Sequence, residues 1–225
     1  MLHSRLFTFN PLGTNCVLLW ADGSSACLVA DPGMSSDDGE RQLVSFLEEH
    51  GLSPEAILLT HGHFDHVWGV ERLLRRWPVP VYLHPSDRFL LRDGASALPG
   101  GMGTIKSMCH DFPTVDVADG DVLSFACGEV QVLHTPGHSP GSVCYLFSQD
   151  NLLLSGDTLF AGSIGRSDLT GGDYDQLMTS IREKLLALPG ETDVIPGHGQ
   201  PTSIAAEGMY NPFLEPFNEP PEDYV

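Results

Sequence analysis

Residues 60–66 restrict the folds open to this chain more than any other stretch. They read Thr-His-Gly-His-Phe-Asp-His and follow directly on the apolar run Ala-Ile-Leu-Leu at 56–59. A short apolar run of this kind is typical of a buried strand. That strand would deliver the polar cluster to a site at its C-terminal end, and the periodic segment 67–76 predicts a helix after it.

The cluster offers several side chains that bind metal ions. His61 and His63 are two residues apart, so both can point to one side of an extended backbone. Asp65 and His66 follow at the start of the predicted helix. Imidazole and carboxylate groups suit zinc, iron or manganese. The alternative, surface histidines in a loop, stays open from this stretch alone because short motifs occur by chance.

Three more metal-binding residue types lie beside predicted strands later in the chain. His138 stands in Thr-Pro-Gly-His-Ser-Pro-Gly, Asp157 in Ser-Gly-Asp-Thr-Leu-Phe, and His198 in Pro-Gly-His-Gly. With the first cluster they make seven donors, more than one tetrahedral ion accepts. Two ions that share a carboxylate are the economical arrangement.

The remaining pattern predicts two series of strands with helices between them. The apolar runs 6–9, 16–20 and 26–30 are separated by turn-forming Gly, Pro, Asn and Asp residues. This pattern predicts an antiparallel meander. The other predicted strands are 79–83, 122–125, 130–134, 142–147, 152–155 and 193–195, and the other predicted helices are 37–50, 87–91 and 173–188. We expect two sheets packed face to face with helices outside, in one domain over residues 1–213, and an acidic, proline-rich tail over 214–225.

Two further features leave alternatives open. Asp31 ends the third predicted strand, where it either caps a turn or helix or holds a ligand histidine from behind. Residues 94–111 lack periodicity, and loops of that length are often lids over a site or disordered. We favour a lid, and we expect His110 within it to be solvated.

Composition excludes several classes of partner. Lys and Arg number 11 against 30 Asp and Glu, a formal charge of -19 that disfavours nucleic acid and anionic membranes. The five cysteines are scattered without Cys-x-x-Cys, which indicates a reducing compartment. No signal-peptide core or run near the roughly 18 apolar residues of a membrane helix is present in the sequence. We therefore expect a soluble, cytoplasmic protein, and its oligomeric state stays open.

A competing motif is Gly-His-Ser-Pro-Gly at 137–141, which matches the Gly-x-Ser-x-Gly of serine hydrolases. That motif needs a helix after the serine and a backbone N–H on the next residue. Here a strand is predicted at 142–147, and Pro140 has no N–H. We therefore predict that Ser139 is not a nucleophile.

On these residues the sequence resembles the metallo-β-lactamase superfamily, whose signature His-x-His-x-Asp-His stands at 61–66. The resemblance implies a four-layer αβ/βα sandwich of the α/β class with a dinuclear metal site at the edge of its sheets. It assigns His61, His63 and His138 to one ion and Asp65, His66 and His198 to the other, with Asp157 bridging them. Zinc is the favoured metal, with iron or manganese as alternatives.

Within the superfamily, Gly-Asp-Thr-Leu-Phe at 156–160 is similar to the glyoxalase II-like thioesterases. This implies a hydrolase that cleaves a small thioester of the hydroxyacylglutathione type with a metal-bridging hydroxide, from which Asp65 would accept the catalytic hydrogen bond. Arg166 would bind a substrate carboxylate, or would only pair with Asp168. Only 26 residues of the sequence follow Gly199, and from this resemblance we expect no C-terminal helical domain of the kind that contacts glutathione in longer relatives.

Other functions in the same superfamily stay open. Persulfide dioxygenases keep these ligands with a single iron and share a stretch like Gly-Arg-Ser-Asp at 165–168. A metal-binding protein without catalysis is a further alternative. A nuclease is disfavoured by the charge of -19.

Overall fold

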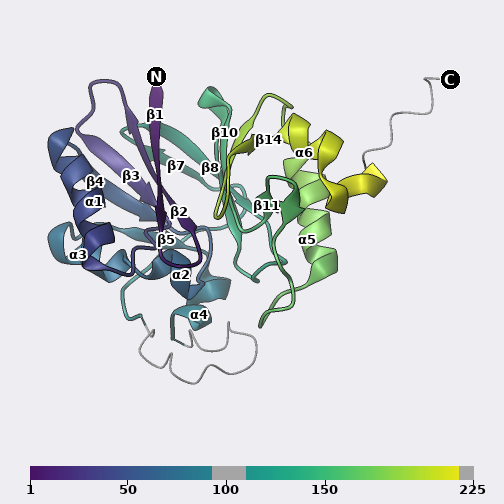
Figure 1. The fold of residues 1–225 in the computed structure, drawn as a ribbon, viewed down its shortest axis with the longest axis horizontal. Helices are drawn as coiled ribbons and strands as arrows, with labels where there is room; N and C mark the ends of the chain where they lie inside the picture. The colour runs from purple at the N-terminus through teal and green to yellow at the C-terminus, as the bar shows by residue number, and fades with distance from the viewer. Residues whose placement is uncertain (93–109, 218–225) are drawn as a thin grey trace.

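Two six-stranded sheets form the frame of the molecule (Figure 1). The computed structural model describes residues 1–92 and 110–217. The first sheet has the strand order β1-β2-β3-β4-β5-β6 and the second β14-β13-β10-β9-β8-β7. A separate hairpin joins β11 to β12.

The strands have the following bounds: β1 Leu2–Phe9, β2 Thr14–Ala21, β3 Ala26–Ala30, β4 Ser53–Leu58, β5 Val81–Leu83, β6 Val115–Asp116, β7 Val122–Phe125, β8 Gly128–His134, β9 Val143–Phe147, β10 Leu152–Gly156, β11 Leu159–Phe160, β12 Ser163–Ile164, β13 Asp193–Pro196 and β14 Thr202–Ser203. The helices are α1 Asp37–Glu49, α2 Phe64–Val67, α3 Val70–Arg76, α4 Arg88–Arg92, α5 Tyr174–Ser180 and α6 Ile204–Tyr210. Short 3₁₀ turns are η1 Pro85–Asp87, η3 Ser148–Asp150 and η5 Pro212–Phe217, and α5 continues as a π-helical turn, Ile181–Leu185.

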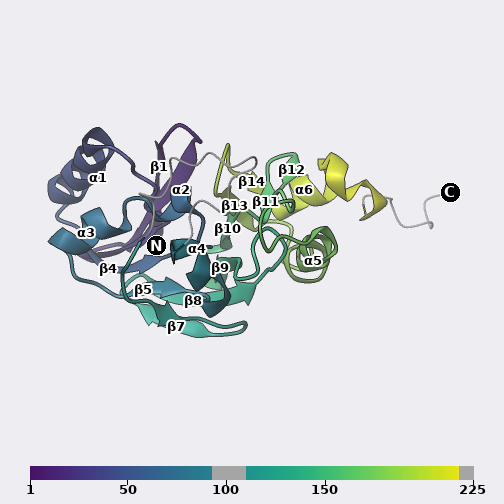
Figure 2. The same cartoon turned by 90° about the horizontal axis from the view of Figure 1, so that it is seen from below.

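The four layers follow from strands that are apolar on both faces. In β2, Leu19 faces the other sheet, in the same core as Val132 and Tyr145 of the second sheet. Its neighbour Leu18 faces the opposite way, into a core that includes Leu43 of α1. A third core packs α5 against the outer face of the second sheet. The α/β sandwich predicted from the sequence is confirmed, with its helices on the two outer faces (Figure 2).

The order of strands brings the site together at one edge. β1, β2 and β3 pair antiparallel, as the meander predicts. From β3 through β4, β5 and β6 the pairing is parallel, and β10 pairs parallel with β13. The carboxyl ends of parallel strands meet at one edge of a sheet, which is where open α/β sheets place their ligands. The segments after β4, β10 and β13 therefore converge.

Some local predictions are corrected by tertiary contacts. The helix expected over 67–76 is divided, because Gly69 lies against the segment after β3 and donates its N–H to the carbonyl of Pro32 at 2.7 Å. A Cβ at Gly69 would lie only 2.5 Å from the backbone carbonyl oxygen of Pro32, so no larger residue fits there without a shift of the backbone. The strands β6 and β14 and the helix α6 were not anticipated.

The two segments predicted to be irregular have different outcomes. The prediction that His110 is solvated is wrong. The residue is only 9% exposed, and its backbone N–H donates to the carbonyl of Leu91 at 2.7 Å. The lid proposed over 94–111 lies almost entirely outside the described residues. Leu214, the first residue of the predicted tail, is fully buried in the third core. In the part of the chain that the structure describes, no helix is long and apolar enough to cross a membrane.

Candidate metal centre

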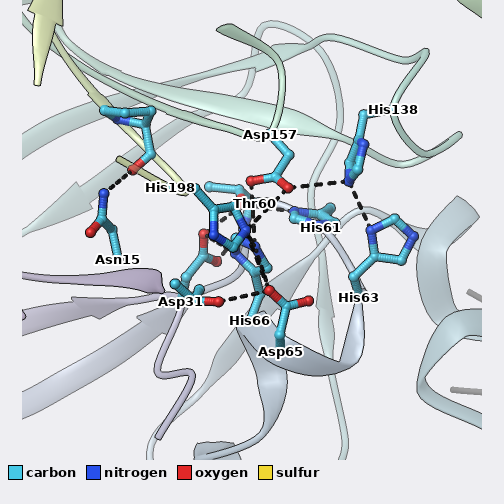
Figure 3. A network of polar contacts seen from close by, with 12 residues as sticks. Asn15, Asp31, Thr60, His61, His63, Asp65, His66, His138, Asp157 and His198 are labelled. Atoms are coloured by element: carbon cyan, nitrogen blue, oxygen red, sulfur yellow. Dashed lines mark hydrogen bonds and ion pairs between the residues drawn. The ribbon is translucent and has the colours of Figure 1, made fainter. Parts of the chain in front are cut away.

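Seven side chains from the ends of four strands converge in one pocket (Figure 3). The loop after β4 and the short helix α2 supply four of them, and the β8–β9 loop, the turn after β10 and the turn after β13 supply one each. These are all the ligand residues predicted from the sequence: His61, His63, Asp65, His66, His138, Asp157 and His198.

They divide into overlapping groups whose ligand atoms lie within 4.8 Å of one another. His61, His63 and His138 form the first cluster, and Asp65, His66 and His198 form the second cluster. Asp157 lies between the two clusters. Its Oδ2 is 3.5 Å from Nε2 of His138 and 3.4 Å from Nε2 of His198. Its Oδ1 is 3.4 Å from Nε2 of His66, so one carboxylate faces both clusters.

Hydrogen bonds behind the histidines fix which ring nitrogen faces the pocket. Nδ1 of His138 donates to the carbonyl of Arg166 at 2.7 Å, and Nδ1 of His198 donates to the carbonyl of Leu12 at 3.1 Å. Nδ1 of His66 donates to the carboxylate of Asp31 at 3.0 Å. A carbonyl or carboxylate only accepts, so each Nδ1 carries the proton. In the neutral ring, Nε2 then presents a lone pair to the pocket.

Several buried polar atoms of the two clusters have no partner within the described chain. Nε2 of His61, Nε2 of His63 and Oδ1 of Asp157 are buried without a hydrogen-bond partner there. Nε2 of His66 and Nε2 of His198 face each other at 3.2 Å. Buried acceptors that face one another are unfavourable unless a proton or cation lies between them. The donor set therefore fits divalent metal ions, the ligand class that imidazole and carboxylate share.

The two clusters differ in how they hold protons. Burial lowers the pKa of His61 well below its ordinary value and that of His63 to about 3. Burial acts in the same direction on His66 and His198, but the neighbouring carboxylates outweigh it. Asp65 and Asp157 raise the pKa of His66 to about 9 and that of His198 to about 11. Without metal at neutral pH, His61 and His63 are neutral, whereas His66 and His198 carry protons.

Two polar residues that open β2 support the second cluster and were missed from the sequence. Oγ1 of Thr14 donates to Oδ2 of Asp65 at 2.7 Å. Nδ2 of Asn15 donates to the carbonyls of Pro196 and Gly199, both at 2.9 Å, and so fixes the turn that carries His198. The sequence signal for these two residues was a pair of polar residues at the start of an apolar strand. In the structure both side chains are buried.

Gly197 is a second missed position. A Cβ there would lie 2.1 Å from Oδ1 of Asp157 and 2.7 Å from Cε1 of His66. Only glycine lets this turn approach the ligands so closely. The signal in the sequence was the pair of glycines on either side of His198.

Asp31 lies behind the centre, as one of the two alternatives from the sequence expects. It accepts from N of Thr60 at 2.8 Å and from Oγ1 of Thr60 at 2.6 Å, in addition to Nδ1 of His66. The Thr60 hydroxyl is also 3.1 Å from Nδ1 of His61. Because that hydroxyl gives its proton to Asp31, it accepts from His61. Asp31 thus orients one histidine of each cluster.

A cavity of about 420 Å³ opens beside both clusters. Its apolar wall consists of Leu12, Phe64, Phe160, Ile164 and Leu169. Arg166 also lines it, but Nε and one terminal nitrogen of its guanidinium each donate to a carboxylate oxygen of Asp168 at 2.8 Å. Of the two roles considered for Arg166, the pairing is present, and the binding of a substrate carboxylate stays a prediction.

Ser139 does not line this cavity. It is fully buried, and its hydroxyl donates to Oδ2 of Asp87 at 2.7 Å. The segment after it is the strand β9, as the sequence predicts.

Similar proteins share nearly the whole length of the chain. The probable metallo-hydrolase YqgX of Bacillus subtilis is 40% identical over 215 residues, which cover 95% of this chain and 98% of the relative. The hydroxyacylglutathione hydrolase GloC of Haemophilus influenzae is 34% identical over 209 residues, which cover 89% of this chain and 92% of the relative.

Solved structures agree with this placement. The crystal structure of the BLEG-1 B3 metallo-beta-lactamase superposes with a TM-score of 0.84 at 38% identity and covers 94% of this chain and 99% of its own. The structure of TTHA1623 in a di-iron-bound form has a TM-score of 0.80 at 38% identity and covers 93% of this chain and 100% of its own. Residues 9–198 match the family model of the metallo-beta-lactamase superfamily, and the chain belongs to that superfamily.

Proposed function

We propose that this protein is a hydrolase that cleaves a small thioester, of the hydroxyacylglutathione type or a close relative, with two divalent metal ions. The carboxylate of Asp157, whose oxygens face His66, His138 and His198 at 3.4–3.5 Å, carries this proposal. A carboxylate in that place can be shared by two ions. The 34% identity to a hydroxyacylglutathione hydrolase supports the substrate class.

The first cluster would hold one ion and the second cluster the other. When bound, such ions lower the pKa of water from about 15.7 to about 7 and polarise a carbonyl group. We favour zinc because its preferred ligands are imidazole and carboxylate, and we place iron second because a relative at 38% identity was solved in a di-iron form. Manganese is the third choice.

The chain itself positions the reacting groups. Asp65 lines the cavity, and its Oδ2 is fixed by the hydroxyl of Thr14 at 2.7 Å, so the carboxylate can accept a hydrogen bond from the attacking water and orient it. Phe64 and Phe160 form part of the apolar wall of the cavity. This wall keeps bulk water away from the reacting groups and suits a compact, uncharged acyl group. No side-chain nucleophile is needed.

The setting of the reaction is also part of the proposal. The charge of -19 favours a small-molecule substrate over nucleic acid or a membrane surface. Cys16, Cys27, Cys127 and Cys144 are free and buried, which suits the reducing cytoplasm.

A second candidate function is the mononuclear iron persulfide dioxygenase reaction. It is kept because Arg166 and Asp168, which belong to the Gly-Arg-x-Asp stretch, form a two-point ion pair at the wall of the cavity. Because both reactions use the same set of ligands, hydrolysis is preferred on the 34% identity to a hydroxyacylglutathione hydrolase.

The test compares the two reactions on the same preparation. Metal content is measured on protein purified without added metal, and thioester loss is followed with lactoylglutathione before and after chelation and reloading with zinc. Oxygen uptake is measured in parallel with glutathione persulfide, and a β-lactam serves as a third substrate because a 38% identical neighbour is a metallo-beta-lactamase. We expect metal-dependent thioester cleavage. One iron per chain with oxygen uptake and no cleavage would refute the proposal.

A further inference from the structure

Asp87 is a buried carboxylate for which the proposed reaction has no use. It ends the turn η1 just before α4, and its side chain is completely buried. Within residues 1–92 and 110–217 it forms no ion pair with Lys, Arg or His. Because a buried charge is unfavourable without partners, its hydrogen bonds are informative.

Three donors converge on this carboxylate from two separate loops. Oδ2 accepts from N of Gly62 at 2.9 Å and from Oγ of Ser139 at 2.7 Å, and Oδ1 accepts from N of Gly141 at 2.6 Å. Gly62 lies between His61 and His63 in the loop after β4. Ser139 directly follows His138 in the β8–β9 loop. Asp87 therefore connects the backbones that carry all three histidines of the first cluster.

The glycines at these positions permit the contact. A Cβ on Gly62 would lie 2.8 Å from the carbonyl oxygen of Asp87, and a Cβ on Gly141 would lie 2.6 Å from its Oδ1. Both distances are too short for any larger residue. The Gly-x-Ser-x-Gly stretch thus has a structural reason in this fold, because its serine and its last glycine are donors to Asp87.

The second cluster is supported by other groups. Its residues are held by Thr14, by Asp31 and by the carbonyl of Leu12. The connection through Asp87 reaches only the first cluster, in which Nδ1 of His63 and Nε2 of His138 lie 2.8 Å apart. In Figures 1 and 2, α4, which follows Asp87, lies beside α2, which follows His63.

We propose that Asp87 is a positioning residue that sets the spacing of His61, His63 and His138 by holding their two loops together. The inference rests on the binding of metal at these histidines and is independent of the substrate. Loss of the carboxylate should loosen the first cluster and leave the second cluster unchanged. Neighbouring residues that orient metal ligands typically change affinity by about 10–100-fold.

Asp87→Asn is the sharpest variant. Asparagine has the same size, but one of its two terminal atoms is an amide nitrogen that cannot accept, so at least one of the three donors loses its acceptor and faces a second donor. The variant is made in two backgrounds of the full chain. His198→Ala leaves the first cluster complete, and His63→Ala leaves the second cluster complete. Zinc affinity is measured by competition with a chromophoric chelator.

We expect Asp87→Asn to weaken zinc binding about tenfold in the His198→Ala background and by less than about twofold in the His63→Ala background. Glu207→Gln is the matched control. Glu207 is also a buried carboxylate with three donors, and it accepts from N of Gly162 at 2.8 Å, from Oγ1 of Thr202 at 2.6 Å and from Nδ2 of Asn211 at 2.7 Å, away from both clusters. It should leave zinc affinity unchanged in both backgrounds.

Equal weakening in both backgrounds, or none in either, would overturn the proposal. If circular dichroism shows that Asp87→Asn does not fold, Ser139→Ala replaces it, because that change removes one donor and keeps the carboxylate and both backbone bonds. We then expect about threefold weaker zinc binding in the His198→Ala background only, in line with the loss of one hydrogen bond. Unchanged affinity there would refute the assignment of Asp87.

Discussion

Replacing Asp31 by asparagine should reverse the tautomer of His66. Oδ1 of Asp31 accepts from N of Thr60, which can only donate, so the amide oxygen of asparagine must take that place. Its amide nitrogen then lies where Oδ2 accepts from Nδ1 of His66 at 3.0 Å. Two donors would face each other unless His66 moves its proton to Nε2. The backbone at residue 31 has φ of +45°, which asparagine tolerates, so the change should not strain the chain.

The size of the effect follows from this conflict. A proton on Nε2 occupies the lone pair that His66 directs at the second cluster. If Nδ1 keeps its proton instead, it stays buried without an acceptor, at a cost of about 1–3 kcal/mol. Since about 1.4 kcal/mol corresponds to a factor of ten, we expect zinc affinity at the second cluster to fall by about 10–100-fold.

The assay is zinc competition with a chelator in the His63→Ala background, where the second cluster alone is complete. Thermal unfolding of the metal-free proteins is recorded beside it. Glu207→Gln again serves as the control for loss of a buried carboxylate. It should lower the unfolding temperature comparably and leave zinc affinity unaltered.

Two results would refute the reasoning about His66. One is a zinc affinity of Asp31→Asn within about twofold of the parent, which would mean that the partner behind the ring does not set its tautomer. The other is an equal loss of affinity in Glu207→Gln, which would trace the effect to general destabilisation.

Three more outcomes are expected. Asp157→Ala should lower both turnover and metal content, which is measured by elemental analysis. Ser139→Ala should keep turnover within a fewfold. If Ser139→Ala abolished hydrolysis with metal still bound, the assignment of water as the nucleophile would be wrong. Because carboxylates outweigh burial and raise the pKa of His66 to about 9 and of His198 to about 11, zinc must displace protons near pH 7. Calorimetry in two buffers of different ionisation enthalpy should detect proton release, and affinity should rise with pH; no release would contradict these pKa values. Phe160→Ala should lower kcat/KM for an apolar acyl thioester by about tenfold, and Phe213→Ala, an exposed phenyl outside the cavity, should not; equal effects would argue against the apolar wall as an acyl site.

The positions of the candidate metal-binding residues were predictable because each follows a recognisable strand. His61, Asp157 and His198 come just after apolar runs, and the carboxyl ends of such strands gather at one edge of an α/β sheet. Residue type and place in the chain are both local properties. Convergence of the side chains then follows from the topology.

The supporting contacts could not be predicted, because they join residues far apart in sequence. Thr14 and Asp65 are 51 positions apart, Asn15 and Pro196 are 181 apart, and Asp87 and Gly141 are 54 apart. A polar side chain at the start of a strand or helix has the same appearance whether it caps that element or reaches across the fold. Asp87 in particular begins a predicted helix, which gives its side chain an ordinary local explanation.

The same limit explains why His110 was misjudged. A histidine in an aperiodic segment is usually solvated, but burial depends on what packs over it. Here the backbone N–H of His110 bonds to the end of α4, and its ring lies 6.1 Å from that of Phe112, which belongs to the first core. No periodic pattern in residues 94–111 records this packing.

The two clusters are therefore supported in different ways around one shared carboxylate. The first cluster lies on two loops that are joined by Asp87, so its geometry depends on how closely η1 packs against both loops. The second cluster depends on the charge of Asp65 and Asp157, which makes its histidines basic and places protons in competition with metal. Since Asp157 faces both clusters, an ion in the first cluster would reduce the negative field at His66 and His198 and lower their pKa. Filling the first cluster thus favours deprotonation of the second, and this coupling needs no movement of the backbone.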